Sequence, residues 1–134
     1  MYLQPKRSKY KKVRKGTLKR LEFKSNKLKF GTIGLKASES GVLTSKQLES
    51  ARQSIARKTD RRGKLWLRIF PDLPITSKPT EVRMGKGKGA VSHWAIKVAC
   101  GKILFEICGV SLSTAKAAFK TGGAKLPIKT TIVS

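Results

Sequence analysis

The sequence predicts an α+β domain: a small mixed or antiparallel sheet with two helices, in the order strand, helix, strands, helix, behind an extended basic N-terminal arm. Three observations indicate this class. Apolar residues make up 39% of the 134 residues and cluster in the second two-thirds of the chain, so one core can form there. Two segments of this part repeat apolar residues at helical spacing. The segments between them alternate apolar and polar residues, as strands do.

Residues 1–30 are predicted to form the arm, and residues 31–134 the single domain. The arm holds twelve Lys and Arg and one acid, Glu22, without a sustained apolar period, so it cannot build a core. A disordered, solvated tail is one interpretation. The formal charge of +24 favours the other, an arm that becomes ordered on nucleic acid. The arm residues expected to neutralise phosphates or stack on bases are Lys6, Arg7, Lys9, Tyr10, Lys11, Lys12, Arg14 and Lys15.

The domain is expected to open with a strand and a helix. Glycines punctuate the apolar stretches of Phe30–Ala37, which suggests a twisted strand or a bulge. Thr44–Gln47 has the capping-box pattern, and a helical period continues to about Thr59. Its apolar face is formed by Leu48, Ala51, Ile55 and Ala56. The opposite face carries Lys46, Arg52, Gln53, Arg57 and Lys58, and this excess of cations favours contact with RNA over a solvated surface.

A strand is expected over residues 64–70, after Arg61, Arg62 and Gly63 end the helix. Leu65, Leu67 and Ile69 fall on one face, which should be core. The other face carries Trp66, Arg68 and Phe70, and both partial burial against the helix and stacking on bases explain this mixture. Three prolines predict a rigid connecting loop over residues 71–79, and Thr80–Met84 is expected to be a short strand.

The last third is predicted to hold a hairpin, a helix and a strand. Val91–Val98 and Ile103–Cys108 have β-like patterns around a turn at residues 100–102, which indicates a β-hairpin. Ser111 opens a second helix that Gly122 and Gly123 end. The residues of its apolar side are Leu112, Ala115, Ala118 and Phe119. Residues 128–133 could add a final strand.

Several classes of function are excluded. No apolar run approaches the roughly 18 residues of a membrane span, and the basic N-terminus contains no secretory signal. Cys100 and Cys108 are expected to be free thiols, because with His93 they leave a zinc site one ligand short. His93 has no catalytic partner at a recognised spacing, and the seven acids form no paired-carboxylate motif. We therefore expect no catalysis, no metal and no cofactor.

The sequence of one loop matches a relaxed nucleotide-binding pattern. Gly85, Gly87 and Ala90 occupy the positions of a relaxed dinucleotide pattern, and Glu106 lies near the distance of a ribose-binding acid. Such a turn must open a helix so that the helix N-terminus meets the pyrophosphate. Residues 91–98 alternate like a strand instead, so cofactor binding is not expected.

The same loop suits a phosphate backbone. Its glycines permit close approach of the main chain, and Arg83, Lys86 and Lys88 supply three cations within six residues. A plain flexible hairpin loop is the alternative.

Long blocks of the sequence resemble one known family. Lys64–Pro79, Glu81–Gly89 and Ala124–Thr131, with Leu3–Tyr10 and Phe30–Ala37, are similar to the bacterial-type large-subunit ribosomal protein L-sixteen family. The resemblance covers essentially the whole chain. It implies an α+β core on large-subunit ribosomal RNA and a position beside the aminoacyl-tRNA site. A free-standing RNA chaperone is the alternative function.

The resemblance also implies partners and contacts. The partners are large-subunit rRNA, aminoacyl-site tRNA and neighbouring ribosomal proteins, with no membrane and no homo-oligomer. Beyond the arm, the expected rRNA contacts are Arg52, Arg57, Lys58, Arg61, Arg62, Lys125 and Lys129. The loop implied to reach the tRNA and the peptidyl-transferase region consists of Arg83, Met84, Gly85, Lys86, Gly87, Lys88 and Gly89.

Three departures from the family pattern indicate a diverged member. Residues 17–29 are rich in Lys where glycine is usual, and Cys108 replaces an acid. Thr121–Gly123 replaces a helix-favouring stretch, which should shorten or loosen the second helix. These differences suggest an organellar ribosome, mitochondrial rather than plastid or bacterial.

Overall fold

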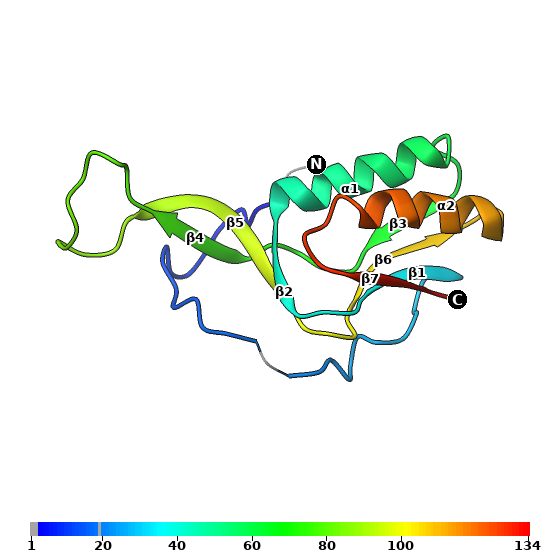
Figure 1. Cartoon of the computed structure of the whole chain (residues 1–134), viewed down its shortest axis with the longest axis horizontal. Helices are drawn as coiled ribbons and strands as arrows, with labels where there is room; N and C mark the ends of the chain where they lie inside the picture. The colour runs from blue at the N-terminus through cyan, green and yellow to red at the C-terminus, as the bar shows by residue number, and fades with distance from the viewer. Residues whose placement is uncertain (1–2, 19) are drawn as a thin grey trace.

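The computed structural model describes residues 3–18 and 20–134. In them, two helices and seven strands confirm the predicted α+β class (Figure 1). The strands are β1 (Ile33–Ala37), β2 (Gly41–Thr44), β3 (Lys64–Leu67), β4 (Leu73–Ser77), β5 (Ala90–Val98), β6 (Ile103–Cys108) and β7 (Thr130–Val133). The helices are α1 (Ser45–Lys58) and α2 (Leu112–Gly123).

The strands form two antiparallel sheets. One has four strands in the order β3-β6-β1-β7, and the other has three in the order β2-β5-β4. The two helices lie side by side and cover one face of the four-stranded sheet (Figure 1). Since β2 leads directly into α1, the three-stranded sheet is joined to this body at one end and extends away from it.

The first helix forms as its local sequence predicts. The Thr44 hydroxyl accepts a hydrogen bond from the Gln47 N–H, and the Gln47 side chain accepts one from the Thr44 N–H, so the capping box is complete. Leu48, Ala51 and Ile55 are fully buried against α2 and the sheet. Their burial anchors a helix whose opposite face remains polar.

The predicted hairpin of β5 and β6 is wrong. Gly101 does turn the chain, with φ +94°, but the two strands that it separates belong to different sheets. β6 pairs with β1 and β3, and all residues of β6 except Cys108 are buried. A central strand with both faces covered gains more from burial than from pairing with its neighbour in sequence.

The segment between Pro71 and Met84 is also organised differently from the prediction. Leu73–Ser77, expected as a loop, forms β4, and Thr80–Met84 forms no strand. Pro74 is compatible with β4 because β4 is an edge strand, where one side of the backbone has no partner to lose.

The second helix ends at Gly123, the second of the two glycines predicted to end it. It runs from Leu112 to Gly123 with Ser111 as N-cap, and Ala115, Ala118 and Phe119 are buried as predicted, whereas Leu112 is exposed. A Cβ on Gly122 would lie 2.5 Å from the Cγ1 of Ile55, so glycine lets α2 approach α1 closely. That Thr121–Gly123 shortens or loosens this helix relative to the family stays a prediction.

The remaining strands agree with the prediction only in part. β3 ends at Leu67, before the predicted boundary; Ile69 is buried, whereas Leu65 and Leu67 are only partly covered. The first strand was expected to be twisted or bulged, and its pairing with β6 has a register shift between Leu35 and Lys36. β7 forms the final strand over Thr130–Val133.

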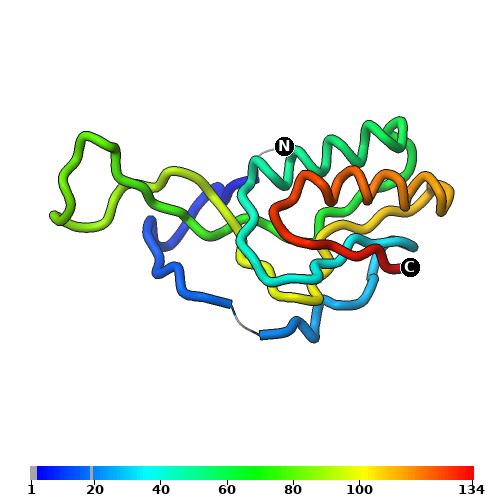
Figure 2. The backbone as a smooth tube through the Cα atoms, viewed as in Figure 1, coloured from blue at the N-terminus to red at the C-terminus, as the bar shows by residue number. Residues whose placement is uncertain are grey.

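The described residues before 31 contain no helix or strand. Their trace runs past the three-stranded sheet and then beneath the four-stranded one (Figure 2). Leu3 joins the core, which was not expected, and the Glu22 N–H donates to the Cys100 carbonyl at 2.9 Å. Residues 1, 2 and 19 of the predicted arm lie outside the described residues. Nowhere in the described chain is there a helix long and apolar enough to cross a membrane.

Candidate nucleic-acid interface

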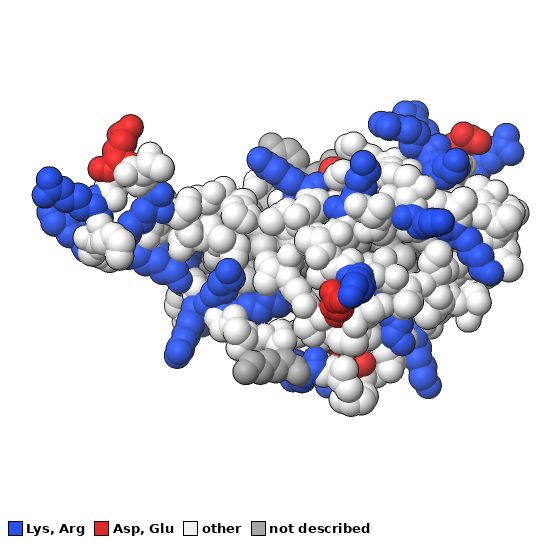
Figure 3. All heavy atoms as spheres, in the orientation of Figure 1, with Lys and Arg blue, Asp and Glu red and all other residues white. Residues whose placement is uncertain are grey.

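A basic loop, residues 78–89, joins β4 to β5 and projects from the body (Figures 1 and 2). It carries Lys78, Arg83, Lys86 and Lys88 against a single acid, Glu81, and all five are exposed. The space-filling view shows basic side chains gathered at this far end of the molecule (Figure 3). The charge therefore lies away from the core and in solvent, which suits contact with a polyanion.

Glycines give the loop its shape. Gly85 and Gly87 have φ of +98° and +91°, and Lys86 between them has φ +53°. No atom lies within 4 Å of a Cβ built at either glycine, so the backbone conformation and not lack of space requires glycine there. At Gly89 the reason differs, since a Cβ would lie 2.4 Å from the Ser77 carbonyl oxygen. Met84, 98% exposed, completes the tip.

Two lysines connect the loop to the arm. Lys88 Nζ donates to the Val13 carbonyl at 2.6 Å, and Lys12 Nζ donates to the Lys88 carbonyl at 2.8 Å. Within the loop, Lys78 Nζ donates to the Gly85 carbonyl. The arm and the loop, about 75 residues apart in sequence, thus form one continuous basic surface.

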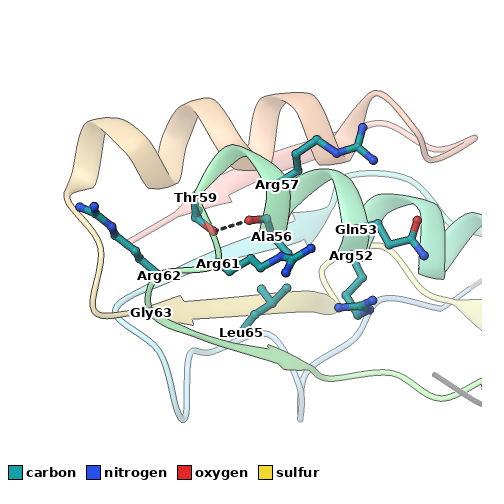
Figure 4. Close-up of a pocket in the computed structure, with 9 residues that line it drawn as sticks. All are labelled: Arg52, Gln53, Ala56, Arg57, Thr59, Arg61, Arg62, Gly63 and Leu65. Atoms are coloured by element: carbon teal, nitrogen blue, oxygen red, sulfur yellow. Dashed lines mark hydrogen bonds between the residues drawn. The ribbon is translucent and has the colours of Figure 1, made fainter.

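A second basic cluster surrounds the end of α1. Arg52, Arg57, Arg61 and Arg62 line a hollow of about 660 Å³ together with Gln53 and Leu65 (Figure 4). Arg52 is held by two hydrogen bonds to the Glu49 carboxylate, at 2.9 and 2.7 Å. Arg57, Arg61 and Arg62 are exposed, and guanidinium groups bind phosphate oxygens in pairs.

The turn after α1 sets the direction of these arginines. The Thr59 hydroxyl donates to the Ile55 and Ala56 carbonyls, both at 3.2 Å, and so closes the last turn. Figure 4 shows the bond to Ala56. Asp60 and Arg61 then adopt left-handed φ values of 51° and 59°. This conformation is unusual for arginine and reverses the chain, so that residues 61 and 62 flank the hollow.

The other predicted contacts are exposed but dispersed. This holds for the arm residues Lys6, Arg7, Lys9, Tyr10, Lys11, Lys12, Arg14 and Lys15. Lys58 is exposed at the end of α1. Lys125 and Lys129 lie between α2 and β7, where Lys129 pairs with Glu39 at 3.0 Å. The structure therefore brings together the arginines of α1, and separately the arm and the loop.

A sequence model of the family described as "Ribosomal protein L16p/L10e" matches residues 5–133, nearly the whole chain. The chain belongs to this family.

Relatives from several bacteria agree with the assignment to L16p/L10e. The "Large ribosomal subunit protein uL16" of Halorhodospira halophila is 52% identical over 132 residues, which cover 98% of this chain and 96% of the relative. The protein of the same name from Buchnera aphidicola is 54% identical over the same shares of both chains. That from Parvibaculum lavamentivorans is 52% identical and covers 98% and 95%.

In this L16p/L10e chain, the glycine loop lacks the helix that a nucleotide-binding turn requires. β5 begins at Ala90, so the glycine loop opens a strand and offers no helix N-terminus to a pyrophosphate. Among the described residues, no group of three or more His, Cys, Asp and Glu could hold a metal. Cys100 and Cys108 are free, and the Cys100 thiol donates to the Ser38 carbonyl at 3.0 Å.

Sequence reasoning missed the buried acid of the L16p/L10e chain, Glu106 on β6. Its carboxylate is fully buried, pairs with Arg68, and accepts backbone N–H bonds from Lys29, Phe30 and Gly31 at 2.6–3.3 Å. Burial raises the pKa of Glu106, but these donors lower it more, so the net pKa lies below its ordinary value of 4.5. A charged residue inside an otherwise apolar strand was the available signal.

Proposed function

We propose that this chain is a structural constituent of the large ribosomal subunit and binds its rRNA. The observation that carries the proposal is the family match over residues 5–133. The relatives, 52–54% identical, are named as proteins of the large ribosomal subunit. A charge of +24 is consistent with a partner made of phosphates.

We further propose that residues 83–89 reach the aminoacyl-tRNA site near the peptidyl-transferase region and contact tRNA. The resemblance of this segment to the family motif suggests the location. The projection of the loop, its exposed cations and the left-handed backbone at Gly85 and Gly87 support contact with a phosphate backbone. The protein performs no chemistry in this proposal; it positions RNA.

The arm, residues 1–30, and the arginines around the end of α1 would supply most rRNA contacts. Both combine exposed cations with little surrounding acid, so each phosphate contact releases counterions. Lys125 and Lys129 add a further contact beside β7. We propose one copy per subunit, with neighbouring ribosomal proteins as its other partners.

The departures from the family pattern lead us to propose an organellar ribosome, mitochondrial before plastid. The relatives reported above are bacterial and lend this compartment no support. Fractionation of the source cells tests it: the chain should copurify with organellar large subunits, and its presence only in the main cytoplasmic ribosome pool would refute it.

Sedimentation through sucrose gradients at increasing salt tests the ribosomal function. We expect the chain, followed by mass spectrometry, to remain with the large subunit in a one-to-one ratio at moderate salt. A free-standing RNA chaperone, held by charge alone, should be released progressively as counterions compete. Release at a salt concentration that leaves other subunit proteins bound would overturn the proposal in favour of the chaperone.

A further inference from the structure

An aromatic pair joins the last residue of the arm, Phe30, to Trp66 of β3. The rings of Phe30 and Trp66 are stacked, with centroids 6.0 Å apart and planes 21° apart. The Lys64 ammonium lies 5.3 Å from the centre of the Trp66 ring. The Arg68 guanidinium and the Lys29 ammonium lie 5.1 and 5.8 Å from the centre of the Phe30 ring. Although these side chains lie around its ring, Phe30 is 51% exposed.

Phe30 is held in this exposed position by its own backbone. The N–H groups of residues 29, 30 and 31 all donate to the buried Glu106 carboxylate, which also binds Arg68. A Cβ on Gly31 would lie 2.7 Å from the Ile107 carbonyl oxygen, so the chain passes flush against the sheet. The backbone that carries the ring is therefore fixed, which lowers the entropy lost when a partner binds.

We propose that Phe30, supported by Trp66, is a stacking platform for one unpaired base of RNA, and that Lys29 and Lys64 contact the flanking phosphates. The proposal rests on the rRNA binding proposed above and specifies one of its contacts. A base inserted between the rings would need a separation of about 7 Å, twice the base spacing of about 3.4 Å. The rings are closer than that, so the base stacks on the exposed face of Phe30.

The charges around the pair favour RNA over a protein partner. Lys29, Lys64 and Arg68 surround the rings, and Glu106, the acid beside them, is fully buried and paired. Such a surface repels other basic chains, whereas nucleotides bring both a ring and a negative charge. Stacking tolerates any base, so the platform fits an unpaired nucleotide of whichever sequence lies there.

Ultraviolet crosslinking of purified large subunits tests the platform directly. Irradiation joins amino acids to bases in contact, and mass spectrometry locates the nucleotide adduct. We expect an adduct on Phe30. Its absence from subunits that contain the chain and carry adducts elsewhere on it would overturn the platform while leaving rRNA binding intact. Subunits without the chain would instead refute the proposed function, and the platform with it.

Phe30→Leu keeps an apolar cover over Trp66 but removes the aromatic face. Stacking on one base is worth enough that we expect binding to subunits lacking the chain to weaken about fivefold or more. Phe30→Trp should restore it. The matched control is Leu112→Ala, since Leu112 is as exposed as Phe30, at 51%, and lies on α2, outside the pair; it should change binding less than twofold. Weaker binding of F30L without any nucleotide adduct at Phe30 in the natural protein would assign the face to a protein partner and overturn the proposal.

Discussion

The two ends of the molecule differ in where their charged side chains lie. In the body, the fully buried Glu106 of β6 pairs with the partly buried Arg68 after β3 and binds the residues leading into β1. In the loop that extends from the three-stranded sheet, residues 78–89 expose four cations beside one acid. The charge of Glu106 contributes to the fold, because its burial makes it depend on Arg68 and on the backbone N–H groups that bind it. Charge in the loop is available to a partner, because folding does not depend on it.

The largest expected effect concerns the body. Glu106→Ala leaves Arg68 and three backbone N–H groups without their acceptor, and should lower the free energy of unfolding by about 3–5 kcal/mol. Chemical denaturation measures it. Glu39→Ala is the control: it breaks the exposed pair with Lys129 and should leave the denaturation midpoint nearly unchanged. Similar losses in both variants would show that the burial of Glu106 adds nothing to its contribution to stability.

Acid should weaken the same pair. The pKa of Glu106 is lower in the folded chain than its ordinary value of 4.5, so its contribution to stability is complete above that value and is lost as the pH falls through the folded pKa. Denaturation midpoints measured between pH 6 and pH 3 should fall more steeply for the natural chain than for Glu106→Gln. Parallel curves would contradict this role of the carboxylate.

An apolar substitution in the body should have the next largest effect. Ile69→Ala opens a cavity in the core and should cost about 2–5 kcal/mol of unfolding free energy. Leu67→Ala should cost less, because Leu67 is only partly buried. Equal losses at the two positions would mean that the end of β3 is buried more deeply than the structure shows.

A smaller effect is expected at the contact of the two helices. Gly122→Ala places a methyl group against the fully buried Ile55, which costs about 1–3 kcal/mol by overpacking, while alanine returns about 1 kcal/mol of helix propensity. We expect a net loss of about 1 kcal/mol in thermal unfolding. Thr121→Ala, an exposed change in the same turn, should not destabilise. A gain in stability for Gly122→Ala would show that the helices can separate slightly without cost.

The smallest effect on stability should come from the loop. Replacing Arg83, Lys86 and Lys88 together by Gln should change the unfolding free energy by under about 0.5 kcal/mol per site. The variant should enter large subunits but bind aminoacyl-tRNA more weakly, as filter binding would measure. The control replaces three exposed lysines of the body, Lys46, Lys116 and Lys120, and should leave tRNA affinity unchanged. Full occupancy with unaltered affinity would refute the proposed role of the loop.

Sequence reasoning succeeded where structure is local. The capping box that starts α1 lies within four residues, and the apolar period of the helix is complete in fourteen. The glycine segment after Met84 was predicted as a loop because its glycines and cations are adjacent, although Thr80–Met84 before it was wrongly expected to be a strand. What decides these features is present in a short window of sequence.

Sequence reasoning failed where the residues or strands that pair are far apart in the sequence. Nothing local tells that β5 and β6 separate into two sheets, because their pairing is decided by β1, β2, β3 and β4. The prolines around β4 suggested a loop, since the edge position that makes Pro74 harmless is a property of the whole sheet. Likewise Glu106 meets its donors about 75 residues earlier in the chain, so its role emerges only in the folded structure.

The crossed hydrogen bonds of Lys12 and Lys88 have a consequence for assembly. Each lysine binds a main-chain carbonyl on the other segment, so the arm and the loop share one orientation. When either segment binds RNA, it limits the positions that the other segment can adopt. The second segment then loses less conformational freedom on binding, so the two binding events are cooperative. The order of attachment can then follow the order in which the RNA sites mature, without a change in the final position of the protein.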